Sequence, residues 1–233
     1  MTNIVVLTGA GMSAESGLKT FRDAGGLWEG HDVMQVASPE GWAADRELVL
    51  DFYNQRRRQL LSVEPNEGHR ALVRLEEKYQ VQIITQNVDD LHERAGSRNV
   101  LHLHGELLKA RSTADPRLVY EWRKDLVAGD TCERGSQLRP HVVWFGEAVP
   151  AMEHAVQQIA EADLVLIIGT SMQVYPAASL IHYAPADAHA YYIDPRPQVN
   201  YELARVRRLQ IIEQTAGIAT PRLVDQLLDH GPA

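Results

Sequence analysis

The stretch Ile4-Val5-Val6-Leu7-Thr8-Gly9-Ala10-Gly11-Met12-Ser13-Ala14 decides the fold. Its apolar start predicts a buried strand, and Gly9, Gly11 and Ala14 follow with the spacing G-x-G-x-x-[GA]. Glycines at this spacing permit a tight strand-to-helix turn and let the backbone approach a pyrophosphate, to which the next helix would offer N–H groups. The stretch therefore predicts the first turn of a nucleotide-binding α/β domain.

Short apolar runs and helical patterns alternate along the rest of the chain. The apolar runs predict buried parallel strands at residues 81–84, 100–103, 142–145, 164–168, 191–193 and 209–212, and helical patterns occupy residues 68–79, 152–161 and 220–229. This alternation predicts a Rossmann-like parallel sheet with helices on both faces.

Two stretches interrupt the alternation. Residues 28–67 look helical, most strongly over 46–61, and contain no convincing strand, while residues 108–139 are polar and carry turn signals. We expect these two stretches to form a smaller inserted lobe. Residues 1–27, 68–107 and 140–233 would then form the Rossmann-like domain.

The composition bounds the class of protein. With 233 residues, 45% hydrophobic and 23% charged, the chain can bury a full core and has the composition of a soluble globular protein. A net charge of -8 argues against a nucleic-acid partner, and the lack of a run of about eighteen apolar residues argues against a membrane span. The single cysteine, Cys132, and a start without signal-peptide features favour a cytoplasmic location.

Polar side chains follow two of the predicted strands. Residues 85–92 read Thr-Gln-Asn-Val-Asp-Asp-Leu-His, and Leu103-His104-Gly105 ends the run that starts at residue 100. Side chains at the carboxyl ends of parallel strands reach a ligand crevice, so Asn87, Asp89 and His104 are candidate ligand contacts. Taken alone, Asn87 and Asp89 are also typical of a helix cap, and a histidine near a strand end is more often structural.

Ordinary hydride transfer is disfavoured. A dehydrogenase of this fold would show a second strand that ends in an acidic residue about twenty positions after the glycine turn. Residues 24–29 read Ala-Gly-Gly-Leu-Trp-Glu and form no such strand. The nucleotide-binding interpretation is unaffected by this difference.

Together these motifs resemble the sirtuin family, the NAD-dependent protein lysine deacylases, over nearly the whole chain. The matching segments are residues 9–18 (GAGMSAESGL), 20–22 (TFR), 86–89 (QNVD), 103–105 (LHG), 142–147 (VVWFGE) and 169–171 (GTS), with Val174 and Pro176. Several independent motifs in the family's order are far more specific than any one of them. The chain looks most like the bacterial desuccinylase and deacetylase subclass, class III.

The resemblance implies an NAD-binding Rossmann domain, a small lobe and a substrate cleft between them. His104 would be the catalytic base that takes a proton from a ribose hydroxyl, and Asn87 would orient the ribose and a water. Asp89 would accept a hydrogen bond from the nicotinamide carboxamide. The implied NAD contacts are Gly9, Ala10, Gly11, Ala14, Glu15, Phe21, Arg22, Trp28, Gln86, Asn87, Val88, Asp89, Gly169, Thr170, Ser171, Asp194, Pro195, Arg196 and Ala219.

The implied reaction takes NAD and an acyl-lysine of a protein, and yields free lysine, nicotinamide and O-acyl-ADP-ribose. Two alternatives remain open: mono-ADP-ribosyl transfer to a protein, and a non-catalytic sensor of NAD or ADP-ribose. The intact segment 86–89 and His104 argue against the sensor, which needs no base. Analysis of the products would separate the two enzymatic alternatives.

A Tyr-x-x-Arg spacing on the predicted helix 46–61 points to the acyl group. Tyr53 and Arg56 are three residues apart and so share a helix face, where a phenol and a guanidinium can bind a carboxylate. This resembles the subclass that removes succinyl and related acidic groups; the alternative is a solvated helix face continuing into Arg57 and Arg58. The other implied substrate contacts, on two segments that would clasp the peptide backbone, are Val142, Trp144, Phe145, Gly146 and Val174.

The chain departs from the family at its zinc site. Most sirtuins hold a structural zinc with two C-x-x-C pairs, whereas this chain has only Cys132, and residues 112–115 replace the earlier pair. Four nitrogen or sulfur ligands cannot be assembled from this set, so we predict no zinc. The lobe would be held by packing of Leu118, Tyr120, Trp122 and Leu126.

Overall fold

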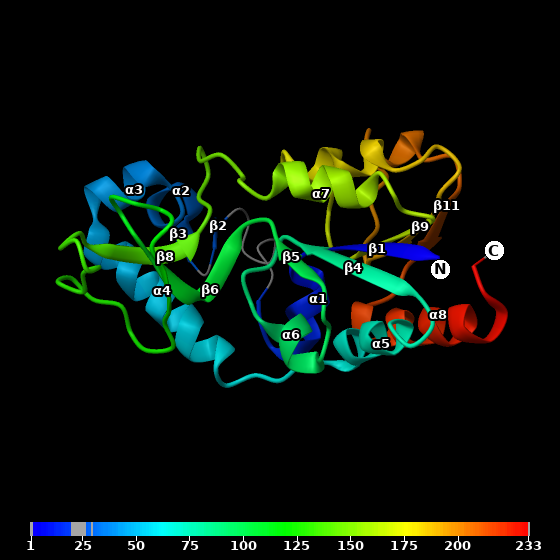
Figure 1. Ribbon diagram of the computed structural model, residues 1–233, viewed down its shortest axis with the longest axis horizontal. Coiled ribbons are helices and arrows are strands. Elements are labelled where there is room, and N and C mark those ends of the chain that lie inside the picture. The colour runs from blue at the N-terminus through cyan, green and yellow to red at the C-terminus, as the bar shows by residue number, and fades with distance from the viewer. Residues whose placement is uncertain (1, 20–26, 29, 233) are drawn as a thin grey trace.

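The computed structural model describes residues 2–19, 27–28 and 30–232, and it shows two parts side by side (Figure 1). The larger part is built on a six-stranded sheet, and the smaller part, at the left of the figure, carries a three-stranded sheet. None of the helices in these described ranges is both long enough and apolar enough to cross a membrane.

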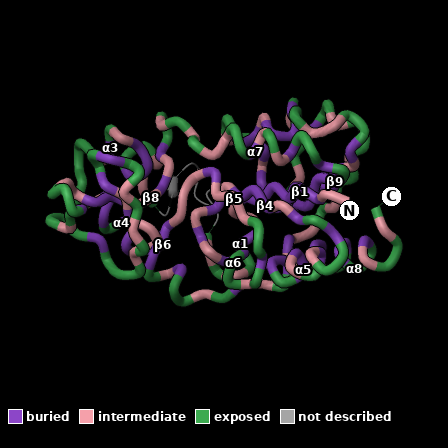
Figure 2. The backbone as a smooth tube through the Cα atoms, in the orientation of Figure 1, coloured by how far each residue is buried: buried purple, intermediate pink, exposed green. Residues whose placement is uncertain are grey.

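The large sheet has the strand order β11-β10-β9-β1-β4-β5, and all neighbouring strands are parallel. Its strands are β1 (Asn3–Thr8), β4 (Gln80–Thr85), β5 (Val100–His102), β9 (Leu164–Ile168), β10 (His189–Ile193) and β11 (Leu209–Ile212). Strands β1 and β9 are buried along almost their whole length (Figure 2), which is why they read as continuous apolar runs. The predicted Rossmann-like sheet is confirmed.

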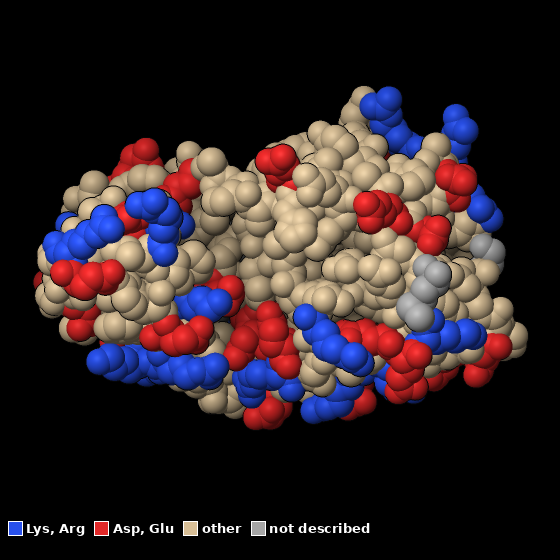
Figure 3. All heavy atoms as spheres, viewed as in Figure 1, with Lys and Arg blue, Asp and Glu red and all other residues tan. Residues whose placement is uncertain are grey.

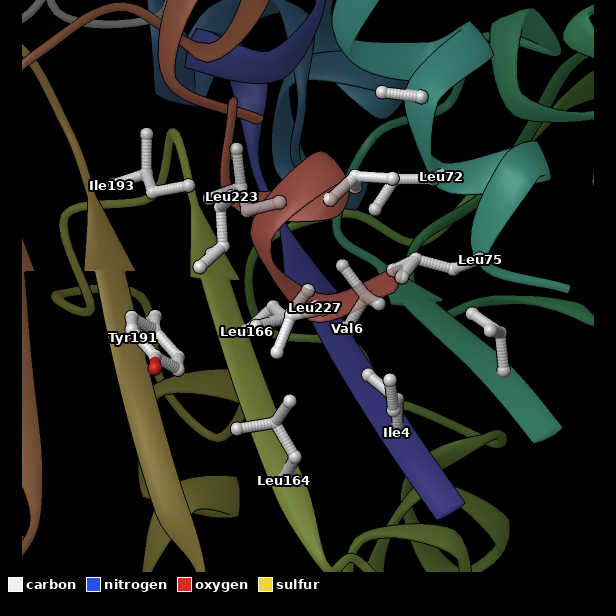
Figure 4. Packing of buried hydrophobic residues seen from close by; sticks show 14 of the residues in the cluster. Ile4, Val6, Leu72, Leu75, Leu164, Leu166, Tyr191, Ile193, Leu223 and Leu227 are labelled. Atoms are coloured by element: carbon white, nitrogen blue, oxygen red, sulfur yellow. The ribbon is translucent and has the colours of Figure 1, made fainter. Parts of the chain in front are cut away.

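Helices cover both faces of this sheet. Because successive strand residues point to opposite faces, Ile4 and Val6 pack against α5 (Glu67–Leu75) and α8 (Ala216–His230), as Figure 4 shows. On the other face, Val5 belongs to the core formed with α7 (Met152–Ile159) and the 3-10 segment η2 (Ala177–Tyr183). The shorter helical segments of this part are α1 (Ala10–Ser13), η1 (Ala14–Ser16), α6 (Leu91–Ala95) and η3 (Leu203–Arg205).

The smaller lobe combines an antiparallel sheet with helices. In its three-stranded sheet, β6 (Gly105–Ser112) lies between β7 (Val119–Glu121) and β8 (Leu138–Val142). The other elements are β2 (Leu27–Trp28), β3 (His31–Asp32), α2 (Val33–Val36), α3 (Pro39–Ala44) and α4 (Arg46–Leu60). Helix α4, predicted over 46–61, begins after Asp45, whose carboxylate caps it by accepting the N–H of Leu48 at 2.9 Å.

Several local predictions were wrong. The run 142–145 is not a strand of the parallel sheet, because β8 ends at Val142 and Trp144, 2% exposed, packs into the core of the lobe. The polar stretch 108–139 contains β7 and most of β6, since antiparallel strands need only alternate residues apolar. Residues 28–67, expected to contain no convincing strand, include the two-residue strand β3. The expected domain boundaries stay a prediction.

The order of the strands determines where a ligand crevice forms. From β1 the chain moves to β4 and β5 on one side, and it later returns to β9 on the other side of β1. In open parallel sheets, ligands bind outside the carboxyl ends of the strands where the order reverses. In this protein that point lies between β1 and β9, beside the glycine turn.

Candidate active site

A cleft of about 810 Å³ occupies this crevice and extends to the small lobe. The predicted NAD contacts that line it are Gly9, Ala10, Gly11, Ala14, Glu15, Gln86, Asn87, Val88, Asp89, Gly169, Thr170, Ser171, Asp194, Pro195 and Arg196. His104 and the predicted substrate contacts Tyr53, Arg56, Val142, Trp144, Phe145, Gly146 and Val174 line the same cleft. Segments far apart in the sequence therefore meet around one space.

Four predicted NAD contacts do not appear among the lining residues. Phe21 and Arg22 lie outside the described residues, and for Trp28 only the backbone, in β2, is described. Ala219 lies in α8, is 2% exposed and packs in the core under the sheet, because it belongs to the apolar face of that helix.

The glycine turn packs directly on the turn that follows β9. The N–H of Gly11 donates to the carbonyl of Gly169 at 2.8 Å, and a Cβ on Gly11 would lie 2.7 Å from the Gly169 Cα. A Cβ on Gly9 would likewise lie 2.7 Å from the Thr170 Cβ, and the N–H of Gly9 donates to the carbonyl of Ile168. These glycines therefore bring two backbone turns together at the floor of the cleft, a shape that fits a dinucleotide, although their own amides are already used.

Glu15 connects the glycine turn to the last helix. Its Oε2 accepts the N–H of Gly217 at 2.6 Å, and its Oε1 accepts the hydroxyl of Thr215 at 3.0 Å. A carboxylate is stabilised at a helix N-terminus by unpaired N–H groups and by the helix dipole. Glu15 borders the cleft, but the contacts seen here are those of a cap on α8.

Asn87 and Asp89 form a buried polar network with Ser13. The Asn87 amide nitrogen donates to the Gly9 carbonyl at 3.0 Å and to the Ser13 hydroxyl at 3.1 Å, which leaves Oδ1 as its acceptor. The Ser13 hydroxyl donates to Asp89 Oδ2 at 2.9 Å, and the N–H of Leu91 donates to Asp89 Oδ1 at 3.2 Å. Burial raises the pKa of Asp89 to about 6, and these two hydrogen bonds oppose the rise. The ionised Asp89 carboxylate therefore lowers the stability of the fold at neutral pH, and groups with pKa values perturbed in this way are often functional.

His104 is held in one tautomer. Its Nδ1 lies 3.0 Å from the carbonyl oxygen of Gln86, and a carbonyl can only accept, so Nδ1 carries the proton. Nε2 then keeps a lone pair and can act as a base. Burial lowers the pKa of His104, which keeps the imidazole neutral near pH 7. Gln86 in turn donates from Nε2 to the Thr170 hydroxyl at 2.9 Å, which joins this end of the cleft to the turn after β9.

The adenosine side of the predicted site is formed by the loop after β10. Asp194, Pro195 and Arg196 all border the cleft. Asp194 is 8% exposed, and its Oδ1 accepts the N–H of Arg196 at 2.8 Å. This contact is an Asx turn, in which a carboxylate shapes the loop that carries it.

The acyl end of the cleft is formed by Tyr53 and Trp144. The Tyr53 side chain is buried, and its hydroxyl accepts the indole N–H of Trp144 at 2.9 Å. Burial also raises the pKa of Tyr53 well above its ordinary value, so the phenol stays protonated and can donate. Arg56 borders the cleft beside it, with its guanidinium 5.1 Å from the ring centre of Phe52.

Arg139 and Glu147 fix the Trp144 turn from behind. Arg139 donates from Nη1 to Glu147 Oε1 at 2.6 Å and from Nη2 to Oε2 at 3.1 Å, and its guanidinium stacks 3.2 Å from the Trp144 ring centre. Glu147 also accepts the N–H of Trp144 at 2.8 Å. The N–H of Phe145 donates to Ala37, so this segment is a turn whose amides are largely used, and it is not an open strand edge.

Sequence reasoning missed several of these residues. Ser13 and Glu147 stand inside the quoted motifs but were given no role, whereas nothing in the sequence marks Arg139 as a partner of Trp144. Arg57, taken as part of a solvated face with Arg58, is 1% exposed and donates to Asn54 at 2.7 Å and to the Leu107 carbonyl at 3.2 Å.

The region of the missing zinc ligands is held by polar contacts. Ser112 accepts the N–H of Ala114 at 3.1 Å and the thiol of Cys132 at 3.4 Å. Asp115 pairs with Arg117 at 2.9 Å and with Arg134 at 3.1 Å. Leu118, Tyr120, Trp122 and Leu126 pack together in this lobe as predicted. Within the described ranges no three His, Cys, Asp or Glu side chains are grouped closely enough to hold a metal, and the absence of zinc stays a prediction.

Charges are mixed on the face of the molecule seen in Figure 3. On the face seen in Figure 3, Lys and Arg alternate with Asp and Glu along the lower edge, and neither sign forms a continuous field. This pattern offers no support for a nucleic-acid track on this face, which would need clustered positive charge.

Comparison with known proteins identifies the family of this chain. The Sir2 family model matches residues 9–176. An NAD-dependent protein deacylase of Helicobacter pylori (strain ATCC 700392 / 26695) is 59% identical over 229 residues, which is 98% of this chain and 99% of the relative. An NAD-dependent protein deacylase of Bacteroides thetaiotaomicron is 57% identical over 203 residues, 84% of this chain and 87% of the relative.

Solved structures of Sir2 homologues have the same fold as this chain. A Sir2 homologue in complex with NAD has a TM-score of 0.85 and 37% identity, covering 99% of this chain and 91% of the other. A mutant Sir2 homologue bound to ADP-ribose has a TM-score of 0.88 and 36% identity, covering 97% and 92%. The protein belongs to the Sir2 family, the sirtuins, and it is an NAD-dependent enzyme of that family.

Proposed function

We propose that this protein removes acyl groups from protein lysines in an NAD-consuming reaction, and that it prefers short acyl groups that end in a carboxylate. NAD-dependent deacylation of proteins follows from the family and from relatives at up to 59% identity. The preference for acidic acyl groups and the roles of the individual residues are ours. The observation that carries them is the placement of Tyr53, Arg56, Asn87, Asp89 and His104 around one cleft.

The chain's own groups divide the work. When bound, NAD supplies a ribose carbon that accepts the acyl oxygen as nicotinamide departs. His104, neutral and with Nε2 unprotonated, accepts the proton of a ribose hydroxyl and returns it later. Asn87 Oδ1 accepts from a ribose hydroxyl, since its amide nitrogen is occupied by Gly9 and Ser13. Asp89, while it is ionised, accepts a hydrogen bond from the NH₂ group of the nicotinamide carboxamide, since an ionised carboxylate can only accept.

The substrate enters between the Trp144 turn and the turn after β9. Phe145, 40% exposed, and Val174 both border the cleft and would flank the peptide. A solved Sir2 complex, 26% identical to this chain, holds a deacetylated peptide together with an O-acetyl ADP-ribose. The lysine side chain would reach inward past Trp144 toward His104.

The acyl carboxylate is recognised by Tyr53 and Arg56. The phenol is kept protonated by burial and is fixed in direction by the indole of Trp144. A protonated phenol and a guanidinium form charge-assisted hydrogen bonds with a carboxylate, which a neutral acetyl group cannot match. Both residues lie on α4 of the small lobe. The small lobe therefore selects the acyl group, while the sheet domain binds NAD.

The test is deacylation of matched acetyl-, succinyl- and glutaryl-lysine peptides, followed by mass spectrometry. Arg56→Met should raise KM for succinyl-lysine by roughly 10- to 100-fold, the range for losing one charge-assisted pair, with little change for acetyl-lysine. Arg58→Met, on the exposed side of α4, is the matched control. Equal losses on both substrates would refute the carboxylate role. ADP-ribose attached to protein, with no deacylated lysine, would favour mono-ADP-ribosyl transfer.

A further inference from the structure

We propose that His102 is a positioning residue of this active site: as an imidazolium it fixes the backbone at Asn87 and keeps the neighbouring Asp89 carboxylate ionised. The proposal rests on the proposed function in that Asn87 and Asp89 contact NAD. His102 itself borders no part of the cleft.

The contacts of His102 define its charge. Its side chain, at the end of β5, is 7% exposed. Nδ1 lies 3.0 Å from the carbonyl oxygen of Asn87, and Nε2 lies 2.7 Å from Oε1 of Glu93 on α6. A carbonyl and a carboxylate both only accept, so both ring nitrogens must donate, and a ring with two N–H groups is charged.

His104 provides an internal comparison. The two histidines hold successive carbonyl groups of one loop, since His104 binds Gln86 and His102 binds Asn87, each through Nδ1 at 3.0 Å. They differ in the partner of Nε2. The Glu93 carboxylate accepts a hydrogen bond from the Nε2–H of His102, whereas the Nε2 of His104 has no such partner among the residues described. One imidazole is therefore an ion that positions the loop, and the other is a neutral base.

The surrounding charges agree with this assignment. Burial alone would lower the pKa of His102, but the hydrogen bond and the charge of Glu93 outweigh burial and raise it, while the pKa of Glu93 is lowered. The positive charge of His102 also opposes the burial that raises the pKa of Asp89. The other charged or titratable groups that interact with this pair or with Asp89 are His69, Asp90, His92, Glu106 and Lys109.

Glu93→Gln separates charge from geometry. With an amide in place of the carboxylate, a neutral imidazole can still donate from Nδ1 to the Asn87 carbonyl and accept the amide N–H at Nε2, so both hydrogen bonds survive. The charges of both partners are lost, but of the two only the His102 charge acts on Asp89, so Asp89 then takes up a proton at a higher pH. His102→Gln removes the charge and one of the two hydrogen bonds, and Glu67→Gln, which breaks an exposed pair with Arg70, is the control.

The experiment measures protonation and NAD affinity. In nitrogen-15-labelled protein near pH 6.5, the ordinary pKa of histidine, His102 should show two protonated ring nitrogens and His104 one. Calorimetric NAD affinity and turnover are then followed from pH 5.5 to 9. In Glu93→Gln the acid limb of the NAD-affinity profile should move up by roughly half a pH unit or more, so that NAD binds about twofold more weakly near pH 6, with turnover near pH 8.5 within about twofold of wild type.

Three results would overturn the proposal: a singly protonated His102, an acid limb of Glu93→Gln that superimposes on that of the wild type, or an equal shift in Glu67→Gln. Melting curves identify any variant that is unfolded, and Glu93→Gln carries the test if His102→Gln does not fold. A wild type that binds NAD but never deacylates a peptide would refute the proposed function and leave the NAD-binding test of His102 intact.

Discussion

Replacing Gly169 by Ala should damage both stability and NAD binding, and Gly135 provides a matched control. Both glycines have positive φ, +60° at Gly169 and +76° at Gly135, so an alanine at either site carries a similar backbone cost of about 1 kcal/mol. Part of that cost is recovered from the lower entropy of the unfolded chain. The environments differ: a Cβ at Gly169 would lie 2.3 Å from the Met12 nitrogen and 2.4 Å from the Gly11 carbonyl carbon, whereas a Cβ at Gly135 meets nothing within 4 Å.

The difference between the two variants isolates the clash. Because the atoms in the way at Gly169 are backbone, the glycine turn must move, and overpacking of this kind costs about 1–3 kcal/mol. Gly169→Ala should therefore lower the free energy of unfolding by about 1–3 kcal/mol more than Gly135→Ala, as measured by urea denaturation followed by tryptophan fluorescence. Calorimetry should show NAD binding weakened at least about tenfold in Gly169→Ala alone. Equal stabilities, or unchanged NAD affinity, would refute the close packing of the two turns as the reason for glycine.

Two further predictions concern stability and metal content. Asp89→Asn should stabilise the fold while it weakens NAD binding. Because the folded-state pKa of Asp89 is raised to about 6, the free energy of unfolding of the wild type falls as pH rises from about 4 through 6, so the variant should gain up to about 3 kcal/mol at pH 8 and nothing below pH 4. A difference in stability that does not change with pH in urea titrations would contradict this. A chelator should leave the melting temperature unchanged, because Ser112, Asp115 and Cys132 are bonded to protein groups; one zinc per chain by elemental analysis, retained after dialysis, would show the prediction wrong.

The sheet was predictable because its strands are buried on both faces. Strands such as β1 and β9 have no solvent face, so the sequence shows them as apolar runs bounded by turns. The run 142–145 carries the same signal for a different reason, since Val142 and Trp144 fill the core of the small lobe. An apolar run indicates burial, and it cannot indicate which core the segment enters.

The site was predictable where backbone geometry fixes a residue type, and not elsewhere. Gly9, Gly11 and Gly169 occupy positions where neighbouring atoms leave no room for a side chain, so the sequence motifs show glycine there. Arg57 is buried with a partner far away in the chain, the Leu107 carbonyl, and Arg139 is buried against Glu147 and the Trp144 ring, but an arginine in a sequence looks the same whether it is solvated or buried. Glu15, predicted to contact the cofactor, borders the cleft, but its contacts with the start of α8 could not be predicted, because those partners come from the other end of the chain.

The bond between Glu15 and the start of α8 has a consequence for synthesis on the ribosome. The glycine turn is translated almost first, yet the groups that hold it, Thr215 and Gly217, follow 200 and 202 residues later. Strand β1 likewise pairs with β4 and β9, both of which emerge long after it. Folding of the NAD site thus waits for nearly the whole chain to be released, and contacts of such long range make folding slow. A nascent chain stalled before α8 should be unable to bind the cofactor, even though it already contains almost every residue that would touch it.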